Sequence, residues 1–228
     1  MNRNTRRRGI FFNLDGILAN SGGAVRGAFE RFAALGGAVP SESDFAAIDG
    51  APLPIAAATL KRRWLLSQSL DELQRRYAGL IDDAFLEIAP APGAAATLET
   101  AFRNGWAVGV VTAHTGARSR AWLARTRLAA YVDIVVGGDE VCLGKPEPEP
   151  YRIALARSGC ARELSIAVED SPSGTKSALA AGIRCYAVAP EGTVSAEWPE
   201  GVRLIERLDE LLPELERQRA RRSAGRRR

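Results

Sequence analysis

The sequence predicts an α/β fold in which a parallel sheet is interrupted, after its first strand, by an all-helical insertion. A short apolar run at residues 10–12 ends in polar residues, which is typical of a buried parallel strand that reaches a ligand site. Residues 21–90 carry helical patterns only. From residue 94 onward, helical and strand patterns alternate, and such alternation indicates a parallel sheet.

The first strand is followed by Asn13, Asp15 and Gly16. In open α/β sheets the ligand binds at the carboxyl ends of the strands, so these residues are candidates for a functional site. A plain core strand followed by a helix N-cap would give the same local pattern. The rest of the chain has to decide between the two interpretations.

The insertion is predicted to contain about four helices, because turn residues divide a long stretch of helical periodicity. Phe29, Phe32 and Leu35 share one helical stripe. The dividing turns fall at residues 36–37, 40, 50 and 52–54, and the Pro-Ala-Pro-Gly segment at 90–93 ends the insertion.

The second part of the chain completes the sheet. We predict helices at 94–104, 116–127, 148–158 and after Pro172, strands at 107–112, 132–136, 165–170 and 184–190, and a last amphipathic helix from Leu208.

The charge of the chain is concentrated at its ends. Lysine and arginine number 31 and aspartate and glutamate 27, but eleven of the basic residues are arginines before residue 9 or after residue 216. The remainder, with 20 basic and 27 acidic residues, carries a charge of −7. Such ends are typical of solvated, disordered tails, and weak salt-sensitive contact with nucleic acid or an anionic membrane is the alternative.

Composition also bounds the class of protein. A hydrophobic content of 46% allows a sizeable core. Cys142, Cys160 and Cys185 form no CxxC pair, which predicts neither a disulfide framework nor a zinc site. No apolar run approaches the roughly 18 residues of a membrane span. We therefore expect a soluble cytoplasmic protein without a signal peptide.

Polar residues follow each of the predicted core strands. Thr112 and His114 follow the second strand, Lys145 lies in the next long loop, and Glu169 and Asp170 end a later strand. Together with Asn13 and Asp15 they place carboxylates, a hydroxyl and an ammonium around one point, where helix N-termini also favour anions. This set suits a divalent metal and a phosphate.

Four segments in this order resemble the signature motifs of the haloacid dehalogenase superfamily, in its phosphoglycolate phosphatase and β-phosphoglucomutase-like branch. The segments are FNLDGILANS, VVTAHT, LGKPEPEPY and VEDSPSG. The resemblance implies a Rossmann-like core at 10–20 and 91–212 and a helical cap at 21–90. A basic disordered tail would then occupy 1–9, and the end of the last helix with an arginine-rich tail 213–228.

The resemblance also implies catalytic roles. Asp15 would be the general acid and base, and its backbone carbonyl would bind Mg²⁺. Thr112, with the neighbouring Ala113 and His114, would bind the transferring phosphoryl group, although a surface or capping role for His114 is the alternative. Lys145 would neutralise the phosphoryl charge and orient the nucleophile.

Glu169 and Asp170 would complete the Mg²⁺ site with oxygen ligands, as that cation requires. Local alternatives exist for several of these residues. Asp15 could form an Asx turn, Thr112 or Asp170 a helix N-cap, and Lys145 a solvated loop cation.

Asn13 departs from the family pattern, because it stands where the resemblance places the nucleophilic aspartate and a metal ligand. A carboxamide is a poor nucleophile and brings no charge to the metal. We therefore expect severely impaired turnover. An introduced substitution and a natural lineage that keeps the pocket for binding both explain Asn13.

The resulting hypothesis is a phosphatase that hydrolyses a small phosphate monoester, of the sugar phosphate or phosphoglycolate type, through an aspartyl-phosphate with Mg²⁺. Residues 21–31 lack the histidine of β-phosphoglucomutase-type mutases, which favours a phosphatase. The alternative is a non-catalytic phospho-ligand-binding or regulatory protein. We expect a small phosphorylated metabolite as partner, a monomer or homodimer, no membrane association and no nucleic acid.

Overall fold

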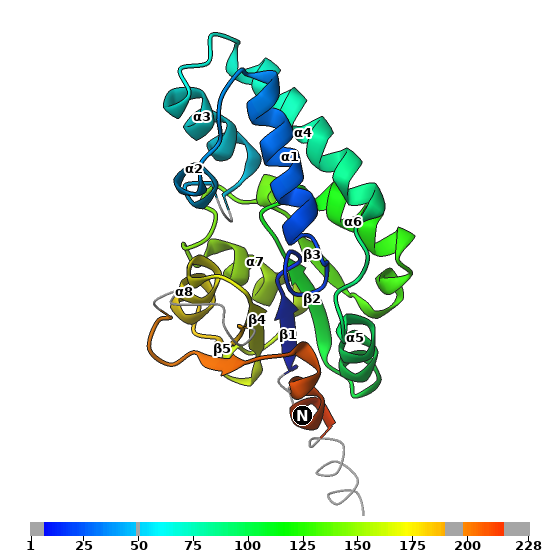
Figure 1. The fold of residues 1–228 in the computed structure, drawn as a ribbon. Helices are drawn as coiled ribbons and strands as arrows, with labels where there is room; N and C mark the ends of the chain where they lie inside the picture. Colours follow the sequence, from blue (N-terminus) through cyan, green and yellow to red (C-terminus); the bar gives the residue numbers. More distant parts are fainter. Residues whose placement is uncertain (1–6, 49–50, 190–197, 217–228) are drawn as a thin grey trace, which may run out of the picture.

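A computed structural model describes residues 7–48, 51–189 and 198–216 of the chain. Of the predicted tails at 1–9 and 213–228, residues 1–6 and 217–228 lie outside these residues. Within them, six strands form one parallel sheet in the order β3-β2-β1-β4-β5-β6 (Figure 1). The strands are β1 (Gly9–Phe12), β2 (Ala107–Val111), β3 (Ile134–Val136), β4 (Ile166–Glu169), β5 (Arg184–Val188) and β6 (Arg203–Ile205). The predicted parallel sheet is confirmed.

The first strand lies in the middle of this sheet because it can be buried on both faces. Ile10 pairs with Val108 of β2 on one side and with Ile166 of β4 on the other. All four residues of β1 are buried. The loops after β1, β2 and β4 therefore leave the sheet as immediate neighbours.

Helices cover both faces of the sheet. α7 (Glu149–Ser158) and α8 (Pro172–Ala180) pack on the face of Phe11, where Tyr151 and Ala178 join its core cluster. α5 (Ala94–Arg103) and α6 (Gly116–Arg125) lie on the opposite face, where Leu98 and Trp122 pack in the same cluster as Phe12. The arrangement is a three-layer, Rossmann-like core.

Between β1 and β2 the chain forms a helical cap at the carboxyl end of the strands (Figure 1). Its helices are α1 (Gly22–Leu35), α2 (Glu42–Ala46), α3 (Leu53–Arg63) and α4 (Leu70–Glu87). Phe29 and Phe32 are buried as predicted, and Phe32 stacks on Tyr77 with ring centroids 4.7 Å apart. Leu35 is 56% exposed instead, because α1 ends there.

The two connections between the cap and the core run side by side. The amide of Asn20 donates to the carbonyl of Ala89 at 3.0 Å, and the amide of Ala91 donates to the carbonyl of Leu18 at 2.8 Å. The chain thus enters and leaves the cap at one place.

Several predicted boundaries differ from the structure, and one strand was not predicted. β1 begins at Gly9, inside the predicted tail, and Arg7 donates to the carbonyl of Ser158. β3 begins at Ile134 instead of residue 132, because the preceding residues form a short 3₁₀ helix at Leu128–Tyr131. Strand β6 was not predicted, since a strand of three residues, two of them exposed, carries too short a pattern.

The last helix starts differently from the prediction. Leu208–Leu211 form a 3₁₀ turn, and α-helical residues follow at 212–216. Pro213 explains the change, because a residue without a backbone N–H fits only the first turn of an α-helix.

Candidate active site

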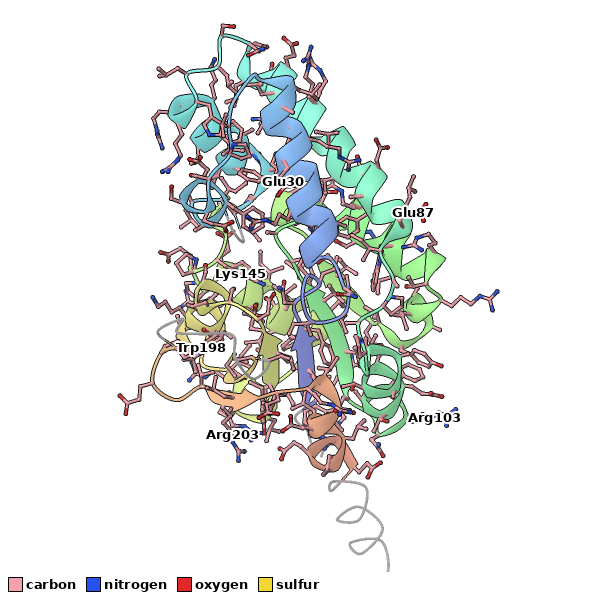
Figure 2. All side chains as sticks on the ribbon, in the orientation of Figure 1. Glu30, Glu87, Arg103, Lys145, Trp198 and Arg203 are labelled. Atoms are coloured by element: carbon pink, nitrogen blue, oxygen red, sulfur yellow. The ribbon has the colours of Figure 1, made fainter. Side chains whose placement is uncertain are left out.

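The polar residues predicted from the sequence come together at the carboxyl ends of β1, β2 and β4. Asn13 and Asp15 follow β1, Ala113 and His114 follow β2, and Asp170 follows β4. Lys145 reaches the same place from the loop before α7. Figure 2 shows Lys145 at the level where the cap meets the sheet, with Arg103 and Arg203 at the opposite end.

Lys145 is a buried cation with three acceptors. Its side chain is only 6% exposed, and Nζ lies 2.5 Å from Glu169 Oε1. Nζ also donates to Asn13 Oδ1 and to the carbonyl of Val111, each at 3.0 Å. An ammonium has three N–H donors, so these contacts satisfy it. The alternative of a solvated loop cation is wrong.

The amide of Asn13 is oriented by its neighbours. Oδ1 accepts from Lys145, while Nδ2 donates to the Asp15 backbone carbonyl at 3.0 Å and to Asp170 Oδ1 at 2.9 Å. The opposite orientation would place an NH₂ group against the Lys145 ammonium, two donors facing each other. Asn13 therefore links the lysine to the carboxylate without needing a charge of its own.

Asp15 is held from two sides. Ser21 Oγ donates to Oδ1 at 2.6 Å, and His114 Nε2 lies 2.8 Å from Oδ2. Burial raises the pKa of Asp15, but His114, the Ser21 hydroxyl and Lys145 lower it, and the net pKa lies below the ordinary value. These bonds are to side chains, so the Asx turn considered from the sequence does not account for Asp15.

His114 is fixed by Arg118, which the sequence analysis missed. Arg118 Nη1 lies 3.2 Å from His114 Nδ1. A guanidinium can only donate, so Nδ1 accepts and the ring proton resides on Nε2, facing Asp15. Spacing of four residues across the start of α6 was the available signal, since such residues share one helix face.

Arg118 also connects this loop to the cap. Its Nε lies 2.5 Å from Asp82 Oδ1, and Nη2 donates to the carbonyl of Ala78 at 3.2 Å. Both partners belong to α4, and the Arg118 side chain is only 6% exposed. The cap is thereby tied to Asp15 through two side chains.

The two acidic residues after β4 occupy different environments. Glu169 is fully buried, accepts from Tyr151 and Lys145, and has one carboxylate oxygen, Oε2, without a partner among the described residues. Burial first, and then the charges of Glu169 and Asp15, raise the pKa of Asp170 to about 7. Ser171 is the N-cap of α8, so the alternative of Asp170 as that cap is wrong.

Thr112 lies beneath the site. The residue is only 3% exposed, and its hydroxyl accepts a hydrogen bond from the amide of His114 at 3.1 Å. The N-cap of α6 is Thr115, so the capping alternative for Thr112 is wrong as well. Ala113 and His114 line the cavity described next, whereas Thr112 does not.

A cavity of about 220 Å³ separates the sheet from the cap. We call its sheet side the polar floor, formed by Asn13, Asp15, His114, Lys145 and Asp170. We call its cap side the apolar roof, formed by Val25, Phe45, Ile48, Leu53, Ala56 and Ile81. Ser171 and Ser173, at the N-terminus of α8, also line it.

The residues present fit a divalent cation only in part. The Asp15 carbonyl and Asp170 Oδ1 are hard oxygen atoms of the kind that bind such a cation, and both accept a hydrogen bond from Asn13 Nδ2. The hydrogens of this NH₂ group would repel a cation placed beside the two oxygens. Among the described residues, no three His, Cys, Asp or Glu side chains are grouped to hold a metal ion. With Asn13 in place, the described residues form no complete set of ligands for a divalent cation.

None of the helices in the described part of the chain has the length and apolar character needed to cross a membrane. This agrees with the absence of a long apolar run in the sequence.

Comparison with known proteins places the site in a family context. The family model for haloacid dehalogenase-like hydrolases matches residues 10–188. Hexitol phosphatase A of Escherichia coli is 32% identical over 194 residues, which cover 82% of this chain and 86% of that protein. A phosphoglycolate phosphatase of Cereibacter sphaeroides is 31% identical over 194 residues, covering 81% and 85%.

A solved structure is similar along nearly the whole chain. It is an aspartate-to-asparagine variant of CbbY from Rhodobacter sphaeroides in complex with xylulose-1,5-bisphosphate. The TM-score is 0.75 at 26% sequence identity, with 91% of this chain and 96% of that chain covered.

Proposed function

This chain belongs to the haloacid dehalogenase-like hydrolase family, and we propose that it acts on a small phosphate monoester with turnover impaired by Asn13. The two relatives described above are named as phosphatases, and their similarity supports a phosphoric monoester hydrolase here. Those relatives are named for hexitol phosphates and phosphoglycolate. A small phosphorylated metabolite is the substrate class that we propose here.

The observation that carries the proposal is the polar floor itself. Lys145 supplies a buried positive charge, and the N-terminus of α8 adds partial positive charge beside Ser171 and Ser173. Both attract a phosphate dianion to the polar floor, and the ester group would then lie toward the apolar roof.

Each residue of the polar floor has a proposed role. Lys145 neutralises the phosphoryl oxygens, and Ala113 and His114 form the wall against which the phosphoryl group lies. Asp15 protonates the leaving oxygen and then takes a proton from the attacking water. A bound phosphate dianion favours the protonated form of Asp15, because a like charge disfavours its ionisation.

Position 13 would carry the nucleophile. An aspartate there would attack phosphorus, form an aspartyl-phosphate and release the alcohol, and water would then hydrolyse the intermediate. The amide of Asn13 lacks the charge for this attack. We therefore propose that the chain binds phosphate esters and hydrolyses them very slowly.

Mg²⁺ is the proposed cofactor, and the Asp15 carbonyl and Asp170 would be its ligands. Glu169 would add negative charge beside them. When bound, it would neutralise charge on the phosphoryl group. Asn13 weakens this site in the present chain, so we expect low Mg²⁺ affinity until a carboxylate occupies position 13.

A non-catalytic phospho-ligand-binding function is the second candidate. It is favoured by the hydrogen bonds of Asn13, which hold Lys145, Asp15 and Asp170 together without a nucleophile. The CbbY variant, with an asparagine in place of one aspartate, holds a bisphosphate.

Asn13→Asp tests the two candidates. Phosphate release from a panel of phosphate esters with Mg²⁺ should rise by on the order of 10³-fold or more, the scale on which loss of a covalent nucleophile lowers turnover. Asn104→Asp, at the end of α5 and away from the cavity, is the matched control and should leave phosphate release unchanged. Mass spectrometry of the Asn13 peptide excludes deamidation as the source of residual activity.

An Asn13→Asp protein that binds Mg²⁺ and a phosphate ester but releases no phosphate would refute the enzyme proposal. If the parent chain bound the same ester equally well, the binding function would take its place.

A further inference from the structure

We infer that the ester bound by this chain carries an apolar leaving group, a short alkyl or aryl group, instead of the polyol of a sugar phosphate. The inference rests on the proposed function of the same site. It comes from the apolar roof, which faces the part of the ligand beyond the phosphate.

Every cap helix contributes apolar side chains to this roof. Val25 comes from α1, Phe45 from α2, Leu53 and Ala56 from α3, and Ile81 from α4. A leaving group that projects from the polar floor toward the cap therefore meets carbon atoms from all four helices.

The roof is part of the packed core of the cap. Ile48, Ala56 and Ile81 are buried members of the large core cluster, and Val25, Phe45 and Leu53 pack against it. Protein cores are close-packed, so these side chains cannot move aside to let polar groups face the cavity. The apolar character of the roof is thus fixed by the fold of the cap.

Polar side chains from the cap are scarce in this cavity. Among the described lining residues, Ser21 and Tyr77 are the only two. The Ser21 hydroxyl already donates to Asp15. The Tyr77 ring stacks on Phe32, and its hydroxyl forms no hydrogen bond with another described residue.

A sugar phosphate would be poorly accommodated here. A hexitol phosphate brings several hydroxyl groups, and each one buried without a partner loses its hydrogen bonds to water. The Tyr77 hydroxyl and the two serines at the start of α8 are too few to satisfy them all. An alkyl chain of the same length loses nothing and gains from burial.

The size of the cavity limits the leaving group. Its volume of about 220 Å³ lies below the ~300–1,000 Å³ of pockets that hold drug-sized ligands. With the phosphate on the polar floor, room remains for a short chain or a single ring.

The test compares two six-carbon esters that differ in their hydroxyl groups, n-hexyl phosphate and sorbitol 6-phosphate. The full-length Asn13→Asp protein is assayed for phosphate release from each. We expect kcat/KM to be at least ~10-fold higher for n-hexyl phosphate, because an apolar pocket discriminates against even one added hydroxyl by about 100-fold. Equal values, or a preference for sorbitol 6-phosphate, would overturn the inference and leave the proposed function intact.

Val25→Thr locates the preference in the roof. It exchanges a methyl group for a hydroxyl at nearly constant volume, and it should reduce the ratio of the two kcat/KM values several-fold. Val39→Thr is the matched control, since Val39 is 91% exposed and does not line the cavity. An unchanged ratio in Val25→Thr would contradict the assignment to the roof.

If the proposed phosphatase function is wrong, neither ester will release phosphate, and binding then tests the inference. If neither ester releases phosphate, the parent chain is titrated with both esters by calorimetry. Tighter binding of n-hexyl phosphate would still support an apolar ligand. Tighter binding of sorbitol 6-phosphate, or binding of neither, would overturn it.

Discussion

The polar floor and the apolar roof are built by opposite means. In the floor, Lys145, Asn13 and Asp170 are joined to one another by hydrogen bonds, so each side chain depends on the charge of its neighbours. In the roof, side chains such as Ile81 and Ala56 contribute shape and carbon surface only. The contrast teaches that phosphate binding and choice of ester are carried by different parts of the chain and can be changed separately.

The largest expected effect comes from removing the cation of the floor. Lys145→Met leaves Glu169 fully buried without its charged partner, which costs about 3–5 kcal/mol of the free energy of unfolding. Chemical denaturation should show this loss, and calorimetry should show that inorganic phosphate no longer binds. Lys176→Met, on the exposed side of α8, is the control. A stable variant that still binds phosphate would show that the floor does not depend on this charge.

A substitution in the roof should lower stability without changing phosphate binding. Ile81→Ala deletes a buried side chain from the cap core, and we expect the free energy of unfolding to fall by about 2–4 kcal/mol. Affinity for inorganic phosphate should stay the same, because Ile81 does not touch the floor's hydrogen bonds. Denaturation and phosphate calorimetry on one preparation check both points. A parallel loss of phosphate affinity would break the proposed separation of floor and roof.

The smallest effect should come from the residue that joins the two parts. Arg118→Met removes the donor that fixes His114 and unties α4 from the loop after β2. In the Asn13→Asp background we expect kcat to fall about fivefold to tenfold, since one such hydrogen bond contributes about 1 kcal/mol.

Nitrogen NMR of the His114 ring tests whether a changed tautomer causes the fall in kcat. The parent should hold its proton on Nε2, and Arg118→Met should show a mixture of the two tautomers. Arg120→Met, an exposed arginine of the same helix, controls for loss of charge. A single unchanged tautomer in Arg118→Met would argue against this role for Arg118.

Much of the polar floor was predictable from the sequence. Asn13, Lys145 and Asp170 each stand in a loop after a recognisable buried strand, and the topology of a parallel sheet brings such loops to one edge. The burial of Lys145 and the orientation of the Asn13 amide were not predictable. Both depend on contacts between residues more than a hundred positions apart.

The apolar roof was predictable only as a set of helical stripes. Periodicity indicates that Phe29 and Phe32 turn toward a core, but both the cap core and the cavity wall are apolar. Which of these residues also face a ligand depends on how four helices pack above the sheet. Arg118 was missed for a related reason, since an arginine on a helix is ordinarily a solvated residue.

The paired connections between core and cap have a consequence for how this chain can be altered. Asn20 and Ala91 are hydrogen-bonded to residues of the opposite connection, so the insertion begins and ends at neighbouring points. A tight turn placed there could bridge the gap left by removing the helices, with the order of the six strands unchanged. We therefore expect the gene segment for the cap to behave as a cassette, which is excised or exchanged for another helical module without changing the order of the strands.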